Sequence, residues 1–163
     1  MTTPEQIYRF LDDIGIAYTV AEHPPTPTTA DALRYARADE GTHCKNILLR
    51  DHKGTHHYLV VCDCRHSIDM EALQRQLGRG RLSFASAARL MRLLGVQAGS
   101  VSPLGLVADT GHAVELIMDE RLQESDRLSF HPNDCRLSLT LTREDFAKFV
   151  LATGRTPLWK KLY

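Results

Sequence analysis

Two apolar runs near the middle of the chain constrain its fold more than any other feature. Residues 44–50 and 57–62 are rich in Ile, Leu, Val and Tyr, and the stretch between them contains DHKG, a turn-forming sequence that ends in glycine. Two such runs joined by a turn are typical of an antiparallel β-hairpin. We therefore expect this hairpin at the centre of a β-sheet.

Helix-start and helix-stop signals flank the hairpin along the chain. Thr3, Pro4 and Gln6 form a capping box with proline in the first turn, and apolar residues then recur at helical spacing until Gly15. Similar signals predict helices over residues 30–38 (capped by Thr28 or Thr29), 70–77, 87–94 and from Thr142 to Gly154. The inner faces expected for two of them are Ala32, Leu33 and Ala36, and Leu90, Met91 and Leu94. Strands are expected over residues 81–85, 113–118 and 136–141.

The remaining segments are loops or ends. The sequence HPPTPTT at residues 23–29 holds three prolines, which exclude both a helix and a central strand, so we expect an ordered loop or an exposed rim there. The final nine residues, RTPLWKKLY, are the candidate for a loose end. The interleaved elements predict a mixed α/β (α+β) single domain over residues 1–163, with a central mixed, largely antiparallel sheet surrounded by helices.

Composition excludes several classes of protein. The 163 residues are 43% hydrophobic and 25% charged, as in an ordinary globular domain. Twenty basic side chains balance twenty acidic ones, so we expect no binding to long DNA by charge alone, and any contact with RNA to be local. No stretch reaches the roughly 18 consecutive apolar residues of a membrane span, and no targeting signal is visible. We expect a cytoplasmic protein with no membrane partner and four free thiols.

Lys45 and Asn46 are the first candidate site residues. Lys45 lies in the apolar strand start CKNILL, where a lysine beside a cleft would offer a compact positive charge to a phosphate or a developing oxyanion. The alternative is an edge lysine whose stem covers apolar surface while its charge reaches water. Asn46 points to the opposite face of the strand and is expected to organise backbone.

A glycine-rich loop and a histidine complete the candidate site. The loop is Gly99, Ser100, Val101, Ser102 and Pro103, and such spacing lets backbone N–H groups turn toward a ligand, although it also serves as a tight connection.

His131, in FHPN, follows a predicted strand, where a side chain is free to face a pocket. It can donate or accept a proton or hydrogen bond at an ester oxygen or a ribose hydroxyl, or simply form the edge of a turn.

Other catalytic patterns are absent. His43-Cys44 and the run Cys62 to His66 bring thiols and imidazoles together, but the cysteine spacing does not match paired zinc knuckles, so we expect no metal. No nucleophile elbow, Walker A loop or dinucleotide fingerprint is present. The chain shows no obvious protein nucleophile, and no cofactor is expected.

Several separated motifs resemble one family. CKNILLRD, YLVV, RLSFAS, LGVQAGSVSPLGL, LIMDERL and SFHPN occur in the order and spacing of the YbaK/ProX superfamily, which includes the editing domain of bacterial prolyl-tRNA synthetases. Within it the chain is most similar to the freestanding prolyl-tRNA editing group, PrdX or ProXp-ala, which acts on alanyl-tRNA(Pro). Ser102 and Leu104 stand where threonine and phenylalanine are more usual, a mild departure that could reshape a small pocket.

The resemblance implies a function and its residues. The expected reaction is hydrolysis of the ester that joins alanine to tRNA(Pro), with the loop Gly99 to Pro103 placing a water at the carbonyl and Lys45 anchoring the tRNA 3′ end. The expected substrate contacts are Lys45, Asn46, Thr26, Thr29 and His131. Prolyl-tRNA synthetase is a possible partner. The alternatives are the same chemistry on serine, cysteine or threonine, and a noncatalytic module that binds tRNA or a nucleotide.

Overall fold

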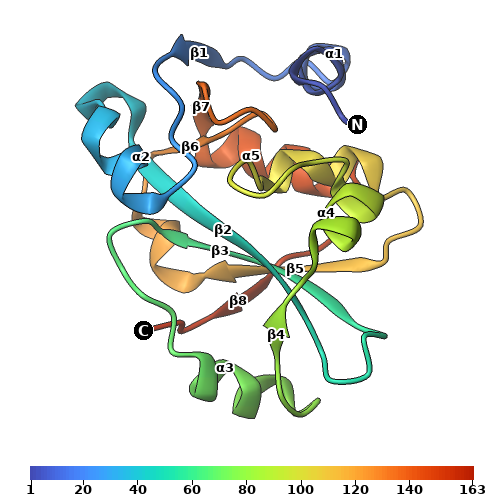
Figure 1. Cartoon of the computed structure of the whole chain (residues 1–163). Coiled ribbons are helices and arrows are strands. Elements are labelled where there is room, and N and C mark those ends of the chain that lie inside the picture. The colour runs from blue at the N-terminus through green and yellow to red at the C-terminus, as the bar shows by residue number, and fades with distance from the viewer.

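The central hairpin forms as the sequence predicts. In the computed structural model, which describes residues 1–163, β2 (Thr42–Arg50) pairs antiparallel with β3 (His57–Asp63), in a register that runs from Cys44 opposite Asp63 to Arg50 opposite His57. Both strands lie in the middle of an eight-stranded sheet (Figure 1). The β-branched and apolar side chains of β3 are buried along the whole strand, as expected for a strand covered on both faces.

The sheet is mixed. Its other strands are β1 (Thr19–Glu22), β4 (Ser83–Phe84), β5 (Val114–Asp119), β6 (Arg127–Phe130), β7 (Leu137–Thr142) and β8 (Leu158–Lys160). Their order is β1-β7-β6-β2-β3-β5-β8, and β4 pairs with β2. The pairings β2–β6, β3–β5 and β5–β8 are parallel, and the others are antiparallel. The fold class predicted from the sequence is confirmed.

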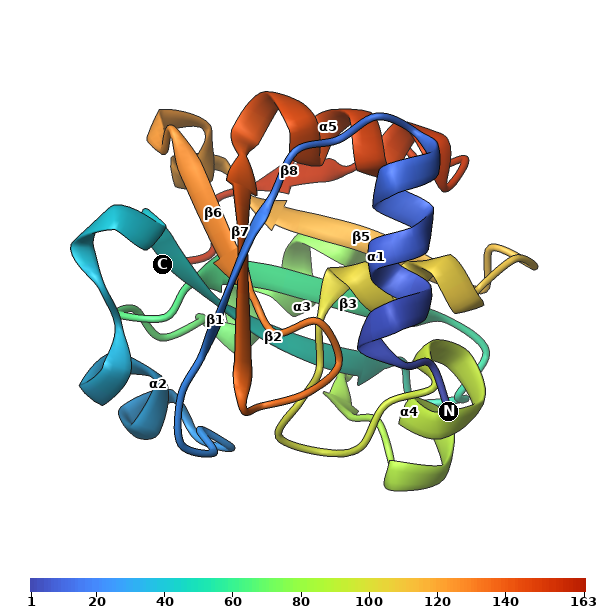
Figure 2. The same ribbon diagram turned by 90° about the horizontal axis from the view of Figure 1, so that it is seen from above.

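Helices cover both faces of this sheet. The α-helices are α1 (Pro4–Asp13), α2 (Thr29–Tyr35), α3 (Met70–Leu77), α4 (Ala87–Leu94) and α5 (Arg143–Ala152), and the 3₁₀ helices are η1 (Ala38–Glu40), η2 (Pro103–Ala108) and η3 (Glu120–Glu124). The predicted caps Thr3, Asp69, Ser86 and Thr142 each accept a hydrogen bond from the first turn of their helix. Figures 1 and 2 show α1, α4 and α5 on one side of the sheet, and α3 on the other. None of the helices has both the length and the apolar character needed to cross a membrane.

The alternation of side chains along β2 and β3 divides the core in two. Leu48, Leu59 and Val61 belong to the larger cluster, beneath α1, α4 and α5, whereas Leu49 and Tyr58 belong to the smaller cluster beside α3. Even-numbered residues of β2 therefore face the larger cluster and odd-numbered residues face the smaller one. This parity places neighbouring side chains of β2 on opposite faces.

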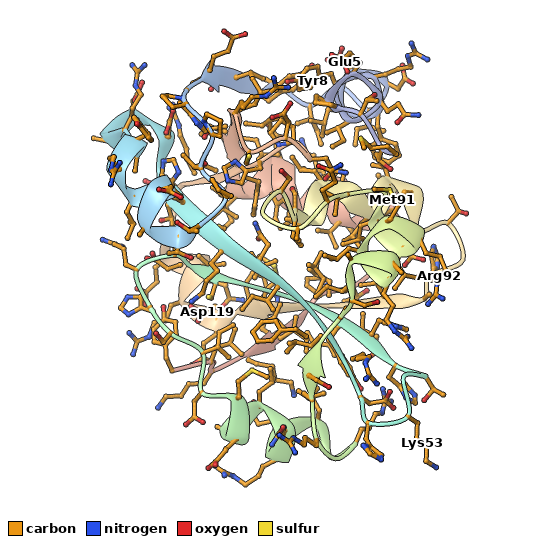
Figure 3. The ribbon with its side chains drawn as sticks, viewed as in Figure 1. Glu5, Tyr8, Lys53, Met91, Arg92 and Asp119 are labelled. Atoms are coloured by element: carbon orange, nitrogen blue, oxygen red, sulfur yellow. The ribbon has the colours of Figure 1, made fainter.

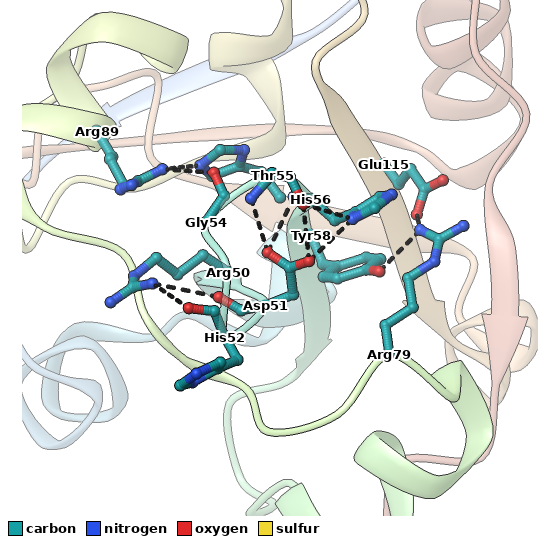
Figure 4. Close-up of polar contacts among 11 residues, drawn as sticks. Arg50, Asp51, His52, Gly54, Thr55, His56, Tyr58, Arg79, Arg89 and Glu115 are labelled. Carbon is teal, nitrogen blue, oxygen red and sulfur yellow. Dashed lines mark hydrogen bonds and ion pairs between the residues drawn. The ribbon is translucent and has the colours of Figure 1, made fainter.

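A polar network closes the hairpin at its far end. The Asp51 carboxylate accepts hydrogen bonds from the backbone N–H groups of Thr55 (2.8 Å) and His56 (3.1 Å), as Figure 4 shows. The bond from the His56 backbone is the largest of several that hold the pKa of Asp51 below its usual value. Arg89 of α4 donates to Gly54 O (3.1 Å). Because β2 ends at Arg50 and β3 begins at His57, the reversal spans residues 51–56 rather than DHKG alone.

Three local predictions were wrong. Helix α2 ends at Tyr35, because Ala36 adopts an extended backbone, and Leu33 on its expected inner face is 43% exposed. Met91 is exposed, with Leu93 buried in its place, since residues 90, 93 and 94 form one stripe at spacings of three and four. Figure 3 labels Met91 beside Arg92 on α4.

The third correction concerns the C-terminal tail. Instead of being loose, it forms β8, which adds a parallel strand beside β5, and it buries Leu162 to 1% exposure. A strand of three residues gives too short a pattern to predict, and its partner lies about forty positions earlier in the sequence.

Candidate active site

One edge of β2 is divided between two partners, and the site lies in the gap between them. β6 pairs with Thr42 and His43 at the start of β2, and β4 pairs with Leu49 and Arg50 at its end. Between these pairings, residues 44–48 have no strand neighbour on this edge. Side chains from both faces of β2 can reach a cleft at such an open edge, which explains how Lys45 and Asn46 share one site despite their opposite directions.

The glycine-rich loop crosses this gap. Asn46 Nδ2 donates to Val101 O (3.1 Å) and lies within 3.4 Å of Cys44 O, so the side chain ties the loop to the strand. Gly99 has φ +88°, and a Cβ atom there would lie 3.0 Å from Pro27 Cβ. Only glycine combines this backbone conformation with so close an approach to the proline-rich segment.

The backbone of Cys135 joins the three loops around the site. Its N–H donates to Ser100 Oγ (3.0 Å), and its carbonyl accepts from the Thr26 backbone N–H (2.9 Å) and the Thr26 hydroxyl (3.0 Å). Ser102 is fully buried, and its Oγ accepts from Leu104 N–H (3.1 Å) at the start of η2. The two loop serines therefore hold the backbone in shape.

These loops enclose a cleft of about 260 Å³. It is lined by residues 26–29, Ala32, residues 44–47, Cys64, Gly99, Val101 and His131. The structure thus brings together Lys45, Asn46, Gly99, Val101 and His131 with Thr26 and Thr29, all of which the sequence singled out. Ser100, Ser102 and Pro103, also predicted as site residues, are buried and do not line the cleft.

Lys45 enters the cleft from the odd-numbered face of β2. Its Nζ donates to the carbonyl of His66 (2.9 Å), in the segment that joins β3 to α3. The side chain is half-buried. Because an ammonium group has three N–H donors, those not bonded to His66 are available to a ligand in the cleft.

The surroundings of His131 favour the neutral imidazole. Its Nδ1 lies 2.9 Å from Leu137 O, and since a carbonyl can only accept, Nδ1 carries the proton. Burial is the main cause that lowers the pKa of His131, and the nearby His23 and His43 lower it further. Nε2 is 3.4 Å from Thr26 Oγ1, whose hydrogen is already donated to Cys135 O, so the Nε2 lone pair remains free as an acceptor.

Two backbone donors of the cleft-lining residues in the loop are also free. The N–H groups of Gly99 and Val101 make no hydrogen bond within the chain, although the N–H of Ser100 between them donates to Gln97 O (3.2 Å). Both residues line the cleft. The residues around the cleft therefore include a cationic donor, two backbone N–H groups without a partner in the chain and one imidazole acceptor.

Sequence reasoning missed part of the lining. Cys44 and Cys64 were considered only as possible metal ligands, yet both line the cleft. Burial raises the pKa of each thiol, which keeps the sulfur protonated and weakly nucleophilic. The structure contains no group of three or more His, Cys, Asp or Glu side chains that could hold a metal ion. The one sequence signal for Cys64 was its spacing of two residues from Cys62, which places both side chains on the same face of the strand.

Comparison with known protein families identifies the chain. A family model described as "Aminoacyl-tRNA editing domain" matches residues 23–149, a span that contains every residue of the cleft. The chain belongs to the aminoacyl-tRNA editing family. It is accordingly an enzyme of the hydrolase class, a deacylase that breaks an aminoacyl ester, and the resemblance in its motifs is confirmed.

Curated relatives of this editing protein span nearly its full length. The "Prolyl-tRNA editing protein ProX" of Acetoanaerobium sticklandii is 37% identical over 156 residues, which cover 96% of this chain and 95% of that protein. The "Prolyl-tRNA synthetase associated domain-containing protein 1" of Mus musculus is 32% identical over 152 residues, covering 91% and 89%.

The fold of the editing protein also matches solved structures. A candidate trans-editing enzyme for prolyl tRNA synthetase superposes with a TM-score of 0.74 at 21% identity, over 98% of this chain and 95% of that one. A scaffold protein used for epitope backbone grafting superposes with a TM-score of 0.75, also at 21% identity and over 98% and 95% of the two chains. At these identities the likeness concerns the fold alone.

Proposed function

We propose that this editing protein removes alanine from mischarged alanyl-tRNA(Pro), acting in trans on tRNA released by prolyl-tRNA synthetase. The names of the ProX and synthetase-associated relatives support the choice of tRNA(Pro) and of the synthetase as a partner. The one structural observation that carries the proposal is the pair of unbonded N–H groups, of Gly99 and Val101, at the wall of a small cleft.

These two donors suit the chemistry of an aminoacyl ester. Such an ester is already activated, so the main task is to stabilise the negative charge that develops on the carbonyl oxygen when water attacks. Backbone N–H groups fixed by the tied loop supply that stabilisation without reorganising during the reaction. A protein nucleophile is not required, which agrees with the protonated thiols of Cys44 and Cys64.

Lys45 and His131 position the other parts of the substrate. The Lys45 ammonium, already oriented by His66 O, is placed to bind the phosphate next to the terminal adenosine. The Nε2 lone pair of His131 accepts a hydrogen bond from the attacking water or from the free ribose hydroxyl that helps to orient it. Neutral His131 can act in this way at physiological pH because burial lowers its pKa.

The size of the cleft supplies the specificity. A synthetase pocket built for proline excludes the smaller alanine weakly, since each missing methylene costs only about 1–3 kcal/mol of binding. A second site that admits alanine and rejects the pyrrolidine ring corrects the error. Residues 26–29 form one wall of this site, and Val101 and Ile47 contribute apolar surface to the rest.

The proposal is tested by measuring release of the amino acid from alanyl-tRNA(Pro), seryl-tRNA(Pro) and alanyl-tRNA(Ala) by the purified protein. We expect fast release from alanyl-tRNA(Pro) and slow release from the other two. Faster release from seryl-tRNA(Pro) would support the same hydrolysis with serine, rather than alanine, as the amino acid removed. Retained tRNA binding without release from any ester would instead indicate a noncatalytic binding module.

A further inference from the structure

The carbonyl that accepts a hydrogen bond from Lys45 belongs to a segment that contacts residues 162 and 163. Residues 64–69 join β3 to α3, and this segment carries both Cys64 of the cleft and His66, whose carbonyl accepts from Lys45 Nζ. Figures 1 and 2 show the C-terminal end of the chain beside this segment. The backbone N–H of Asp69 donates to Leu162 O (2.8 Å), which links the two directly.

An aromatic stack makes the second link. The rings of His66 and Tyr163 lie nearly parallel, at 13°, with centroids 4.2 Å apart. The guanidinium carbon of Arg121, from η3, lies 4.7 Å from the centroid of the Tyr163 ring. Tyr163 is therefore packed between an imidazole and a cation, an arrangement that favours one orientation of the ring.

Neighbouring residues restrict the position of Tyr163. The preceding residue, Leu162, is buried in the smaller core cluster with Tyr58, Val60 and Ile117. Burial, followed by the Asp119 carboxylate, raises the pKa of Tyr163, which keeps its hydroxyl neutral. A fixed ring thus supports His66, and His66 supports Lys45.

We propose that Tyr163 is a positioning residue for Lys45 in the deacylation reaction. By stacking on His66 it fixes the carbonyl that orients Lys45 Nζ toward the substrate phosphate. A lysine side chain without this acceptor would sample many rotamers, and the productive one would be populated less often. This inference rests on the proposed function, since it gives Lys45 its role in binding alanyl-tRNA(Pro).

A double-mutant cycle separates this role from a merely structural one. Tyr163→Ala and Tyr163→Phe are made in the wild-type protein and in Lys45→Met, and kcat/KM for alanyl-tRNA(Pro) is measured for each. We expect Tyr163→Ala to lower kcat/KM about tenfold, mainly by raising KM, and Tyr163→Phe, which keeps the ring, to change it less than about twofold. In the Lys45→Met background, Tyr163→Ala should cause no further loss.

Equal losses in the two backgrounds, or full activity of Tyr163→Ala in the wild-type background, would overturn the proposal. If Tyr163→Ala does not fold, His66→Gly removes the stack from the other side while keeping the carbonyl, and the same cycle is run with it. Trp159→Ala, in β8, is the matched control for loss of an aromatic ring near the C-terminus, and should match the wild type.

A second readout does not depend on activity. Acetylation of Lys45 by acetic anhydride, followed by mass spectrometry, should be faster in Tyr163→Ala than in the wild type, and unchanged in Tyr163→Phe and Trp159→Ala. Unchanged reactivity in Tyr163→Ala would contradict the coupling between Tyr163 and Lys45. If the wild-type protein releases no amino acid, the proposed function is wrong, and this measurement still decides whether the coupling exists.

Discussion

Lys45 is the side chain whose charge the proposed reaction uses most directly. Lys45→Met keeps most of the aliphatic stem and removes the ammonium group, so we expect kcat/KM for alanyl-tRNA(Pro) to fall by about 10²-fold, with little change in the free energy of unfolding. Lys53→Met is the matched control, because Lys53 is exposed and lies at the opposite end of the β2–β3 hairpin (Figure 3). Similar losses in both variants would indicate that only the overall positive charge matters.

His131 gives the protein a defined response to acid. Because burial lowers the pKa of His131 below its ordinary value of 6.5, the unfolded state binds a proton more readily than the folded state once the pH falls below that value. Titration of His131 therefore leaves the free energy of unfolding unchanged above about pH 6.5, and lowers it as the pH falls below that value. The half-buried ring of His43 and the buried ring of His57 also have lowered pKa values, and they act in the same direction.

The contribution of His131 is measured by urea unfolding at pH 7.5 and pH 5.5. His131→Gln cannot titrate, so we expect it to lose less stability between the two pH values than the wild type loses, with the remaining loss due to His43 and His57. An equal loss in variant and wild type would show that His131 is protonated equally in the folded and unfolded states.

The loop of residues 99–103 acts as one element, and its shape depends on Gly99. Gly99→Ala places a Cβ atom 3.0 Å from Pro27 Cβ at a positive φ, so we expect it to displace the free N–H groups and lower kcat at least tenfold. Gly80→Ala is the matched control, since Gly80 has a similar φ of +80° and open space around its Cβ position. Backbone strain should cost each variant roughly 1 kcal/mol of stability, Gly99→Ala should lose more because of its contact with Pro27, and only Gly99→Ala should lose activity.

The elements themselves were predictable wherever the signal was local. Thr3, Asp69 and Ser86 cap their helices as predicted, because a cap depends on residues within one turn. The burial of Leu162 was not predictable, since it depends on β8 pairing with a distant strand. The predicted end of α2 was wrong for a related reason. Its residues bury little surface, and the helix ends where Ala36 adopts an extended backbone.

At the scale of the whole molecule, the sequence identified the residues of the cleft better than their arrangement. Lys45, Gly99 and His131 were singled out one by one, but nothing local indicated that β6 and β4 leave an open edge on β2 between them. That gap is a property of the complete sheet, and it allows the loop to reach Asn46 and side chains from both faces of β2 to line the cleft. The role of Tyr163 depends in the same way on segments that meet only in the folded chain.

The measurement that tests the central claim most directly is the single-turnover rate of deacylation of alanyl-tRNA(Pro) compared with prolyl-tRNA(Pro). Both substrates carry the same tRNA through the same kind of ester bond, so the ratio of their rates, each taken relative to the rate without enzyme, reports how the cleft treats the amino acid. We predict rapid release of alanine, and release of proline close to the rate without enzyme. Equal rates for the two esters, or faster release of proline, would contradict a cleft that selects alanine by size.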